Sequence, residues 1–435
     1  MHPPGPNEAD WIVQVNESLN FEFLPSDGQQ VPAHITDLNP DAYLPQVVSF
    51  GPYHHGKDHL LPMEEHKHRT LHRFLKRSGK CLESFLDSLR EVAQALEESY
   101  DALDPMWKVG SSEDAASKFL KLMITDGCFL LEILRTTTEE KLDYAVNDPI
   151  FSSHGKLHIM PHIKRDMLML ENQLPMLVLH RLVAVESDGK KNPYSDNLVF
   201  SALTLYSNNT TVSKDIGKCL HVLDVYRKSL LLPEKKSEEK KSKEKPKLPK
   251  EGSKDGEEMI WSATKLHEHG IKFSKSDTSS LKDISFASGV LRLPMITVDD
   301  TTWYVFLNLI LFEHFHVGAG NEVTSYIFLM DKIIDKEGDV ALLEAQGIIQ
   351  NAIGSDKAVA ELFNSLCKEV TLEPESGLDP GHAAVRKYCK NSWFTWIAAL
   401  CHTYFGSPWS VLSLVAAILL FAIAIIQTAY TMIYH

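Results

Sequence analysis

Apolar side chains dominate two long stretches in the first half of the chain. Residues 117–135, SKFLKLMITDGCFLLEILR, carry them so densely that they predict a helix largely buried in a core. Residues 163–183 have the same character, and Pro175 should break or kink the middle of that segment. Both stretches therefore predict the helices of a large hydrophobic core.

A third helix is predicted for residues 62–77. Pro62 suits its first turn, and the acidic start and basic end of the segment complement the helix dipole. Residues 1–40 carry several prolines and polar residues, which is typical of an irregular lead-in. We assign residues 41–232 to the N-terminal part of a helical domain.

The C-terminal part of that domain is assigned to residues 259–395 and begins with a minor β element. Apolar residues at 290–293 follow a strand-like pattern. A turn is expected at Asp299 and Asp300, followed by a helix from about Thr302. One of the two aspartates should cap that helix.

Two further helices are predicted within residues 339–370. They should be separated near Gly354, with Ser355 or Asp356 in the capping position. Between the two parts of the domain, residues 233–258 carry almost no apolar side chains. Because nothing there could offset the entropy of ordering, the segment predicts a disordered, charged insertion.

The last apolar stretch, residues 409–433, has the length of a membrane span, because ~20 helical residues cross a hydrocarbon layer. We predict a C-terminal transmembrane helix after a juxtamembrane segment, 396–408. Arg386, Lys387 and Lys390 precede it, which places the bulk of the chain in the cytoplasm. The expected partner of the helix is the lipid bilayer, in a single-pass, tail-anchored arrangement at the plasma membrane, with the endoplasmic reticulum as the alternative.

The predicted fold class is mainly α, a large helical domain with a minor β element plus one C-terminal transmembrane helix. With 435 residues and 44% hydrophobic composition, the chain can bury a substantial core. Its formal charge of −14 argues against a nucleic-acid partner, because binding phosphates needs an excess of cations. The six cysteines lie far apart without a C-x-x-C pair, so neither a zinc ribbon nor a dense disulfide framework is indicated.

Histidines are concentrated between residues 51 and 72, and five of them are candidate metal ligands: His54, His55, His59, His68 and His72. His68 and His72 are four apart and would share one face of the predicted helix. A catalytic zinc needs three protein ligands, so one of the earlier histidines would have to fold back. The alternative is a polar turn whose histidines form local hydrogen bonds, and we therefore expect no metal and no cofactor.

Three polar residues lie within strongly apolar segments: Asp126, Glu171 and Asn172. If buried, each needs a partner, which the histidines or backbone amides of residues 51–59 could supply. We expect these residues to form a structural polar network. No catalytic residue is assigned, because the familiar hydrolase, zinc-protease and nucleotide-binding motifs are absent from the sequence.

Six phrases, in order, point to one family. They are VSFGPYHHGKDHLLPMEEHKHR, DGCFLLEIL, DMLMLENQLPMLVL, GVLRLPMITVDDTT, DVALLEAQGIIQNAIGSD and YFGSPWSVLS. Together they closely resemble the plant proteins grouped as domain of unknown function 247, also called uncharacterised plant protein family 0481. The likeness extends from about Val48 to the C-terminus.

The resemblance implies a plant membrane protein with one C-terminal span and no established enzymatic activity. It also implies a signalling or recognition role, because some members resemble self-incompatibility determinants in grasses. We expect a recognition or signalling scaffold that binds a protein partner through its helical domain. The alternative is a membrane-anchored hydrolase or metalloenzyme that uses the histidines of residues 54–72. The oligomeric state stays open.

Overall fold

The computed structural model describes residues 31, 33–36, 39–138, 144–188, 218–232, 261–316, 318–367, 416 and 419–426. The charged insertion predicted at 233–258, the juxtamembrane segment at 396–408 and most of the lead-in lie outside the described residues. The described chain is mainly helical with a few short strands, as predicted.

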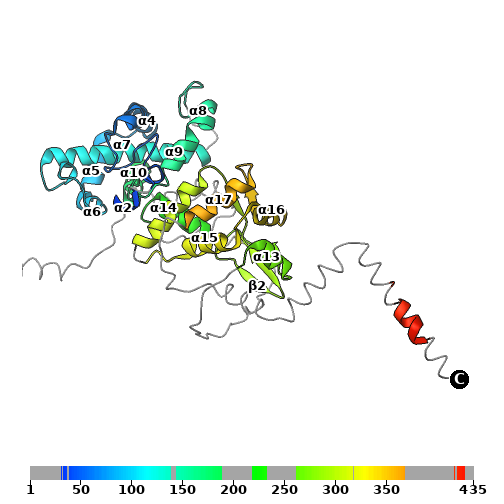
Figure 1. Ribbon diagram of the computed structural model, residues 1–435. Coiled ribbons are helices and arrows are strands. Elements are labelled where there is room, and N and C mark those ends of the chain that lie inside the picture. The colour runs from blue at the N-terminus through cyan, green and yellow to red at the C-terminus, as the bar shows by residue number, and fades with distance from the viewer. Residues whose placement is uncertain are drawn as a thin grey trace, which may run out of the picture.

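Among the described residues, the regular elements of the N-terminal part are helices (Figure 1). They are α2 (Ala33–Thr36), α3 (Pro40–Tyr43), α4 (Leu61–Ser78), α5 (Leu82–Arg90), α6 (Ala93–Glu98), α7 (Glu113–Thr138), α8 (Ser153–His158), α9 (Met160–Asp166) and α10 (Met176–Glu186), with short 3-10 turns at Asp58–Leu60 and Pro105–Trp107.

Helix α4 confirms the helix predicted at 62–77, because proline stands in its first turn as expected. Its C-terminus is fixed by Gly79, which adopts a left-handed φ of 67° and donates its backbone N–H to Leu75 O at 3.1 Å. A residue with a Cβ is strained in that conformation. The glycine therefore marks the end of the helix.

Helix α7 contains the predicted segment 117–135 and is the centre of this part, with α4, α5 and α10 packed against it. Gly127 allows α10 to come close. A Cβ at that position would lie 2.6 Å from Leu182 Cδ1 and 2.9 Å from Val178 Cγ1. A glycine is thus required where the two helices meet.

The segment predicted as a helix over 163–183 is interrupted more widely than a proline kink requires. Helix α9 ends at Asp166, and α10 begins at Met176, directly after Pro175. Residues 167–175 form an irregular connection, which we call the α9–α10 loop. Its backbone is held by hydrogen bonds to buried side chains, a stabilisation that hydrophobic periodicity does not show.

The C-terminal part combines helices with two small sheets. Its elements are α12 (Val222–Leu231), α13 (Ala263–Glu268), β1 (Lys272–Lys275), β2 (Ser285–Ala287), β3 (Val290–Leu293), β4 (Ile296–Val298), α14 (Thr302–Phe315), α15 (Glu322–Ile333), α16 (Glu337–Ala345), β5 (Ile349–Asn351) and α17 (Asp356–Leu366). We count α12 in this part, rather than in the predicted N-terminal range 41–232, because it packs against α15. One sheet has the order β1-β3-β2, with β1 parallel and β2 antiparallel to β3. The other pairs β4 with β5 in parallel.

Several sequence predictions for this part are confirmed. The strand expected at 290–293 is β3, and the helix expected from Thr302 is α14. The aspartate cap expected for α14 is wrong, because its N-cap is Thr301 without a side-chain cap, and Asp299 Oδ1 instead accepts from Thr301 N at 2.9 Å in the preceding turn. Ser355 is the N-cap of α17, and its hydroxyl accepts from Ala358 N. The first helix expected within 339–370 is shorter than predicted, because α16 ends at Ala345 and strand β5 follows it.

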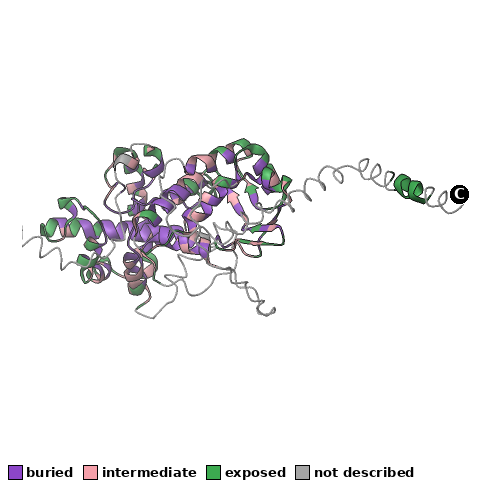
Figure 2. Cartoon of the chain, turned by 60° about the horizontal axis from the view of Figure 1, so that its bottom comes forward, coloured by how far each residue is buried: buried purple, intermediate pink, exposed green. Residues whose placement is uncertain are grey.

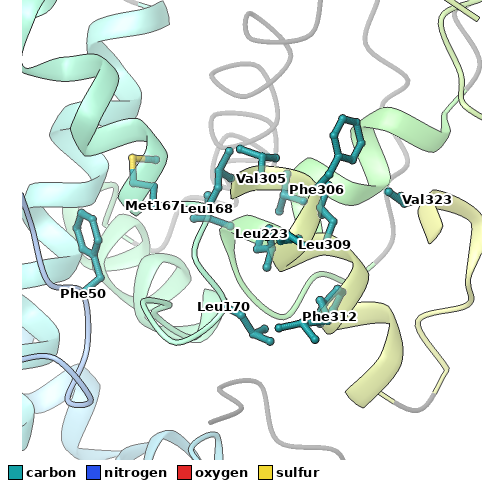
Figure 3. Close-up of a cluster of buried hydrophobic side chains, with 14 of the residues drawn as sticks. Phe50, Met167, Leu168, Leu170, Leu223, Val305, Phe306, Leu309, Phe312 and Val323 are labelled. Atoms are coloured by element: carbon teal, nitrogen blue, oxygen red, sulfur yellow. The ribbon is translucent and has the colours of Figure 1, made fainter. Parts of the chain in front are cut away.

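The two parts share one core, which extends through both in Figure 2. In Figure 3, apolar side chains of the α9–α10 loop face those of α14, and Leu168 lies beside Val305. A polar contact joins the same surfaces: the buried Asn308 of α14 accepts from Leu170 N at 2.8 Å and donates to Ala42 O at 3.0 Å.

The predicted transmembrane helix is contradicted. Of residues 409–433 the structure describes residue 416 and the helical stretch 419–426, drawn in red in Figure 1. Across everything the structure describes, no helix has both the length and the apolar character needed to span a bilayer. The predicted bilayer partner, the tail anchor and the single-pass location are corrected with it.

Candidate functional site

The candidate metal ligands have separate surroundings. His54 is buried, whereas His59 is exposed and its Nε2 lies 3.0 Å from Pro45 O. His55 packs edge-on against Trp107, with ring centroids 5.4 Å apart. His68 and His72 lie exposed on α4. Within the described ranges, no group of three or more His, Cys, Asp or Glu side chains could hold a metal ion.

Buried side chains contact residues 46–59, which we call the histidine-rich turn, and Asp166 is one of these side chains. The Asp166 carboxylate is fully buried, and its Oδ2 accepts hydrogen bonds from the backbone of Gln46 at 3.0 Å, Val47 at 2.7 Å and Val48 at 3.0 Å. Burial raises the pKa of Asp166, and the three amides and Arg165 oppose that rise. Sequence reasoning missed this residue, because a lone aspartate at a helix end carries no distinguishing signal.

Asn172 also binds backbone groups of the histidine-rich turn. Its Oδ1 accepts from Phe50 N at 2.6 Å, and its Nδ2 donates to Val48 O at 3.0 Å and to Asp166 O at 2.9 Å. All three of these hydrogen bonds are buried. The side chain thereby ties the turn to the α9–α10 loop.

Asp126 of α7 binds the residue that follows Phe50 in the turn. Its Oδ2 accepts from Gly51 N at 2.9 Å, and its Oδ1 forms an ion pair with Lys67 Nζ at 2.7 Å. Lys67 is also fully buried and pairs with Glu64 at 2.6 Å. Burial raises the pKa of Asp126 despite the opposing charge of Lys67.

Gly51 is the turn position where conformation and space both require glycine. Its φ is 73°, and a Cβ there would lie 2.9 Å from Gln173 O and 2.9 Å from the Tyr100 hydroxyl. Gln173 itself donates to Met167 O and Met169 O and accepts from Leu223 N. The turn therefore fits closely against a loop that is ordered by its own amide side chains.

Glu171 joins the turn to the start of the described chain. Its Oε1 accepts from Val31 N at 2.7 Å, and its Oε2 lies 3.2 Å from His54 Nε2. Lys57 Nζ lies 2.8 Å from His54 Nδ1. Because an ammonium can only donate, this contact leaves the ring hydrogen on Nε2, facing Glu171.

A second buried ion cluster surrounds Glu132, which lies further along α7 than Asp126. It accepts from Arg77 Nη1 at 2.8 Å, Tyr144 Oη at 2.9 Å and Arg135 Nη1 at 3.1 Å. Burial alone favours the neutral acid, but the hydrogen bonds and charges of the two arginines lower the pKa of Glu132 overall. The cluster is an ion network that links α4 to α7.

A pocket of about 350 Å³ opens where α9 meets α12, β4 and the start of α14. Its apolar wall includes Leu168, Val305 and Phe306, which lie together in Figure 3. Its charged lining consists of Lys164, Arg165 and Asp299, and Tyr226 also contributes.

Burial changes the proton affinities of two pocket residues. It lowers the pKa of Lys164 to about 8 and raises the pKa of Tyr226 to about 12, the latter with a smaller contribution from Asp299. Near neutral pH the lysine is therefore largely charged and the phenol is neutral. The pocket thus presents cationic donors beside an apolar surface.

Comparison with known proteins places the whole chain in one group. The model of the DUF247 family, described as a plant protein of unknown function, matches residues 29–423. A UPF0481 protein of Arabidopsis thaliana is 30% identical over 424 residues, which cover 92% of this chain and 84% of the relative. A putative UPF0481 protein of the same plant is 24% identical over 523 residues, which cover 97% of this chain and 94% of the relative.

No solved structure matches the chain. The family match spans nearly the whole sequence, as the six phrases indicated. The chain therefore belongs to the DUF247 family of plant proteins of unknown function.

Proposed function

We propose that the protein is a recognition or signalling scaffold that binds another protein through its helical body, rather than an enzyme. The observation that carries the proposal is the state of the buried polar groups. Asp126, Asp166, Asn172 and Glu171 each accept hydrogen bonds from backbone amides. An acid or base in catalysis must reach its substrate's proton, whereas these groups hold the fold.

The scaffold hypothesis is supported by the hydrogen bonds that join distant segments of the chain. The backbone of Val31, of residues 46–51 and of the α9–α10 loop is fixed by side chains from distant positions. Such a body presents a surface of defined shape, and a rigid surface loses little conformational entropy when a partner binds. Recognition would thus depend on the assembled body.

The assembled body can be tested through Asn308, which joins α14 to both Ala42 and Leu170. We would fuse a biotin ligase to the N-terminus of the full-length chain and compare the wild type with Asn308→Ala in plant cells. The substitution loosens the junction without changing a surface charge. We expect a small set of proteins labelled by the wild type and lost with the variant; the same labelled set in both would contradict the proposal.

Elemental analysis of the purified full-length chain supplies a second readout. A scaffold should carry no stoichiometric metal. Zinc, manganese or iron at one equivalent per chain would count against the proposal and favour a metalloenzyme.

A further inference from the structure

We propose that the pocket between α9, α12, β4 and α14 binds a small molecule that carries one anionic group, a carboxylate, on an apolar body. This small-molecule site is separate from the protein-binding surface of the proposed function. The geometry points to it through three features: a buried guanidinium with spare donors, a continuous apolar wall, and a net charge that matches a single anion.

Arg165 is the buried cation. Its exposed fraction is 5%, and its Nε and Nη1 have no hydrogen-bond partner among the described residues. Nη1 lies 3.6 Å from Asp166 Oδ1, beyond hydrogen-bond distance. A buried donor without a partner is costly, and Arg165 is one of the residues that line the pocket.

The guanidinium is already held in position. Its Nη2 donates to Asp41 O at 2.8 Å, and its plane lies over the Tyr304 ring at 4.0 Å from the centroid. Asp166, its neighbour in sequence, is fixed by three backbone amides on its other oxygen. A ligand would therefore meet a cation whose ordering cost is already met by the fold.

The remaining wall suits an apolar body. Leu168 from the α9–α10 loop and Val305 and Phe306 from α14 face one another there (Figure 3), and Leu230 and Ile296 extend the surface. A volume of about 350 Å³ lies at the small end of the range typical of ligand pockets, ~300–1,000 Å³. The space fits a compact molecule and not a peptide.

Asp299 limits the charge of the ligand. Its Oδ1 accepts hydrogen bonds from Thr301 N, Thr301 Oγ1 and Thr302 Oγ1, at 2.9, 2.8 and 2.9 Å. Among the residues that line the pocket, two cations and one carboxylate leave a single net positive charge, and Asp166, 3.6 Å from Arg165, offsets part of it. This small positive charge suits a monoanion and disfavours a phosphate monoester.

Lys164 is the adjustable cation. Because burial lowers its pKa to about 8, it is charged near neutral pH and loses its proton within the mildly alkaline range. Tyr226, whose pKa burial raises to about 12, stays neutral over that range. Binding of an anion should therefore weaken between about pH 7 and about pH 9.

The test is calorimetric titration of the full-length chain near neutral pH with three probes that share one alkyl chain: octanoate, 1-octanol and octyl phosphate. We expect saturable binding of octanoate at one equivalent, at least about tenfold tighter than either other probe, since a charge-assisted hydrogen bond has about that effect. Absent octanoate binding, or octanol or octyl phosphate binding as tightly, would overturn the proposal.

Two matched variants locate the site. Lys164→Met keeps the length of the side chain and should weaken octanoate at least about tenfold while leaving octanol unchanged. Lys156→Met removes the same charge from an exposed position on α8 outside the pocket and should leave both affinities unchanged. Equal octanoate affinity in the wild type and Lys164→Met would refute the assignment, and it would do so without bearing on whether the chain binds a protein.

Discussion

Buried carboxylates in this protein are stabilised as much by backbone amides as by cations. Asp166 receives three amide hydrogens on one oxygen, and Glu171 combines an amide with a histidine. An amide donor satisfies a carboxylate and at the same time fixes the main chain that carries it. At the level of single residues, these side chains therefore decide the path of segments that have no regular secondary structure.

Replacing Glu171 with Ala should lower the free energy of unfolding by about 2–4 kcal/mol, because Val31 N loses its buried acceptor and His54 Nε2 loses the carboxylate that lies 3.2 Å away. Urea unfolding of the full-length chain measures the change. Glu171→Gln retains an acceptor oxygen and should lose less. Glu344→Ala, at an exposed position of α16, is the control and should leave stability nearly unchanged; equal losses for Glu171→Ala and Glu344→Ala would refute the role.

His221 predicts acid sensitivity. Burial lowers its pKa from 6.5 to about 4, so between these values the unfolded chain binds a proton that the folded chain does not. Stability therefore falls as the pH drops through this window, by up to about 3 kcal/mol from this residue.

The control variant is His221→Asn. His221 Nδ1 accepts a hydrogen bond from Asp224 N at 3.2 Å at the start of α12, and Asn can accept the same hydrogen bond because it is a good N-cap. In urea unfolding at several pH values, the wild type should lose stability more steeply than His221→Asn below about pH 6.5. Parallel pH profiles would contradict the assignment.

At the level of helices, the close contact between α7 and α10 can be tested at Gly127. Gly127→Ala would place a Cβ 2.6 Å from Leu182 and 2.9 Å from Val178, so α7 and α10 must separate or repack. Overpacking of this kind costs about 1–3 kcal/mol. Gly338→Ala in α16 meets only Thr264 Cγ2, at 3.9 Å, and should be neutral or slightly stabilising. Thermal unfolding that ranks the two variants equally would refute the close contact.

The elements that sequence predicted best are those with a local physical signal. Proline and acidic residues at its start and basic residues at its end marked α4, dense apolar residues marked α7, and Ser355 marked the start of α17. The α9–α10 loop and β5 were missed, because the loop depends on hydrogen bonds to Asp166, Asn172 and Gln173 and β5 on pairing with β4. Contacts between distant residues leave no periodic trace in the sequence.

The candidate site residues also divide into those that the sequence could predict and those that it could not. Asp126, Glu171 and Asn172 were noticeable as polar residues in apolar segments, and the structure brings each into contact with residues 31–54. Lys164 and Arg165 gave no such signal, because their meeting with α14 depends on tertiary structure. Sequence hydropathy also predicted a transmembrane helix, which the described residues do not contain.

At the scale of the whole molecule, the two parts are held by one core and by hydrogen bonds that cross between them. Asn308 links α14 to the N-terminal part, and Leu223 N donates to Gln173 at 3.1 Å across the same junction. The described body should therefore unfold as a unit, and the histidine-rich turn should unfold together with it. This view requires the turn to be as stable as the helices that hold it.

Amide hydrogen exchange of the full-length chain tests that requirement most directly. The amides of Gln46, Val47, Val48, Phe50 and Gly51 lie outside helices and strands, yet each donates to a buried side chain. They should exchange as slowly as the central amides of α7, because both open only with global unfolding. Exchange at the rate of an exposed loop would contradict the account.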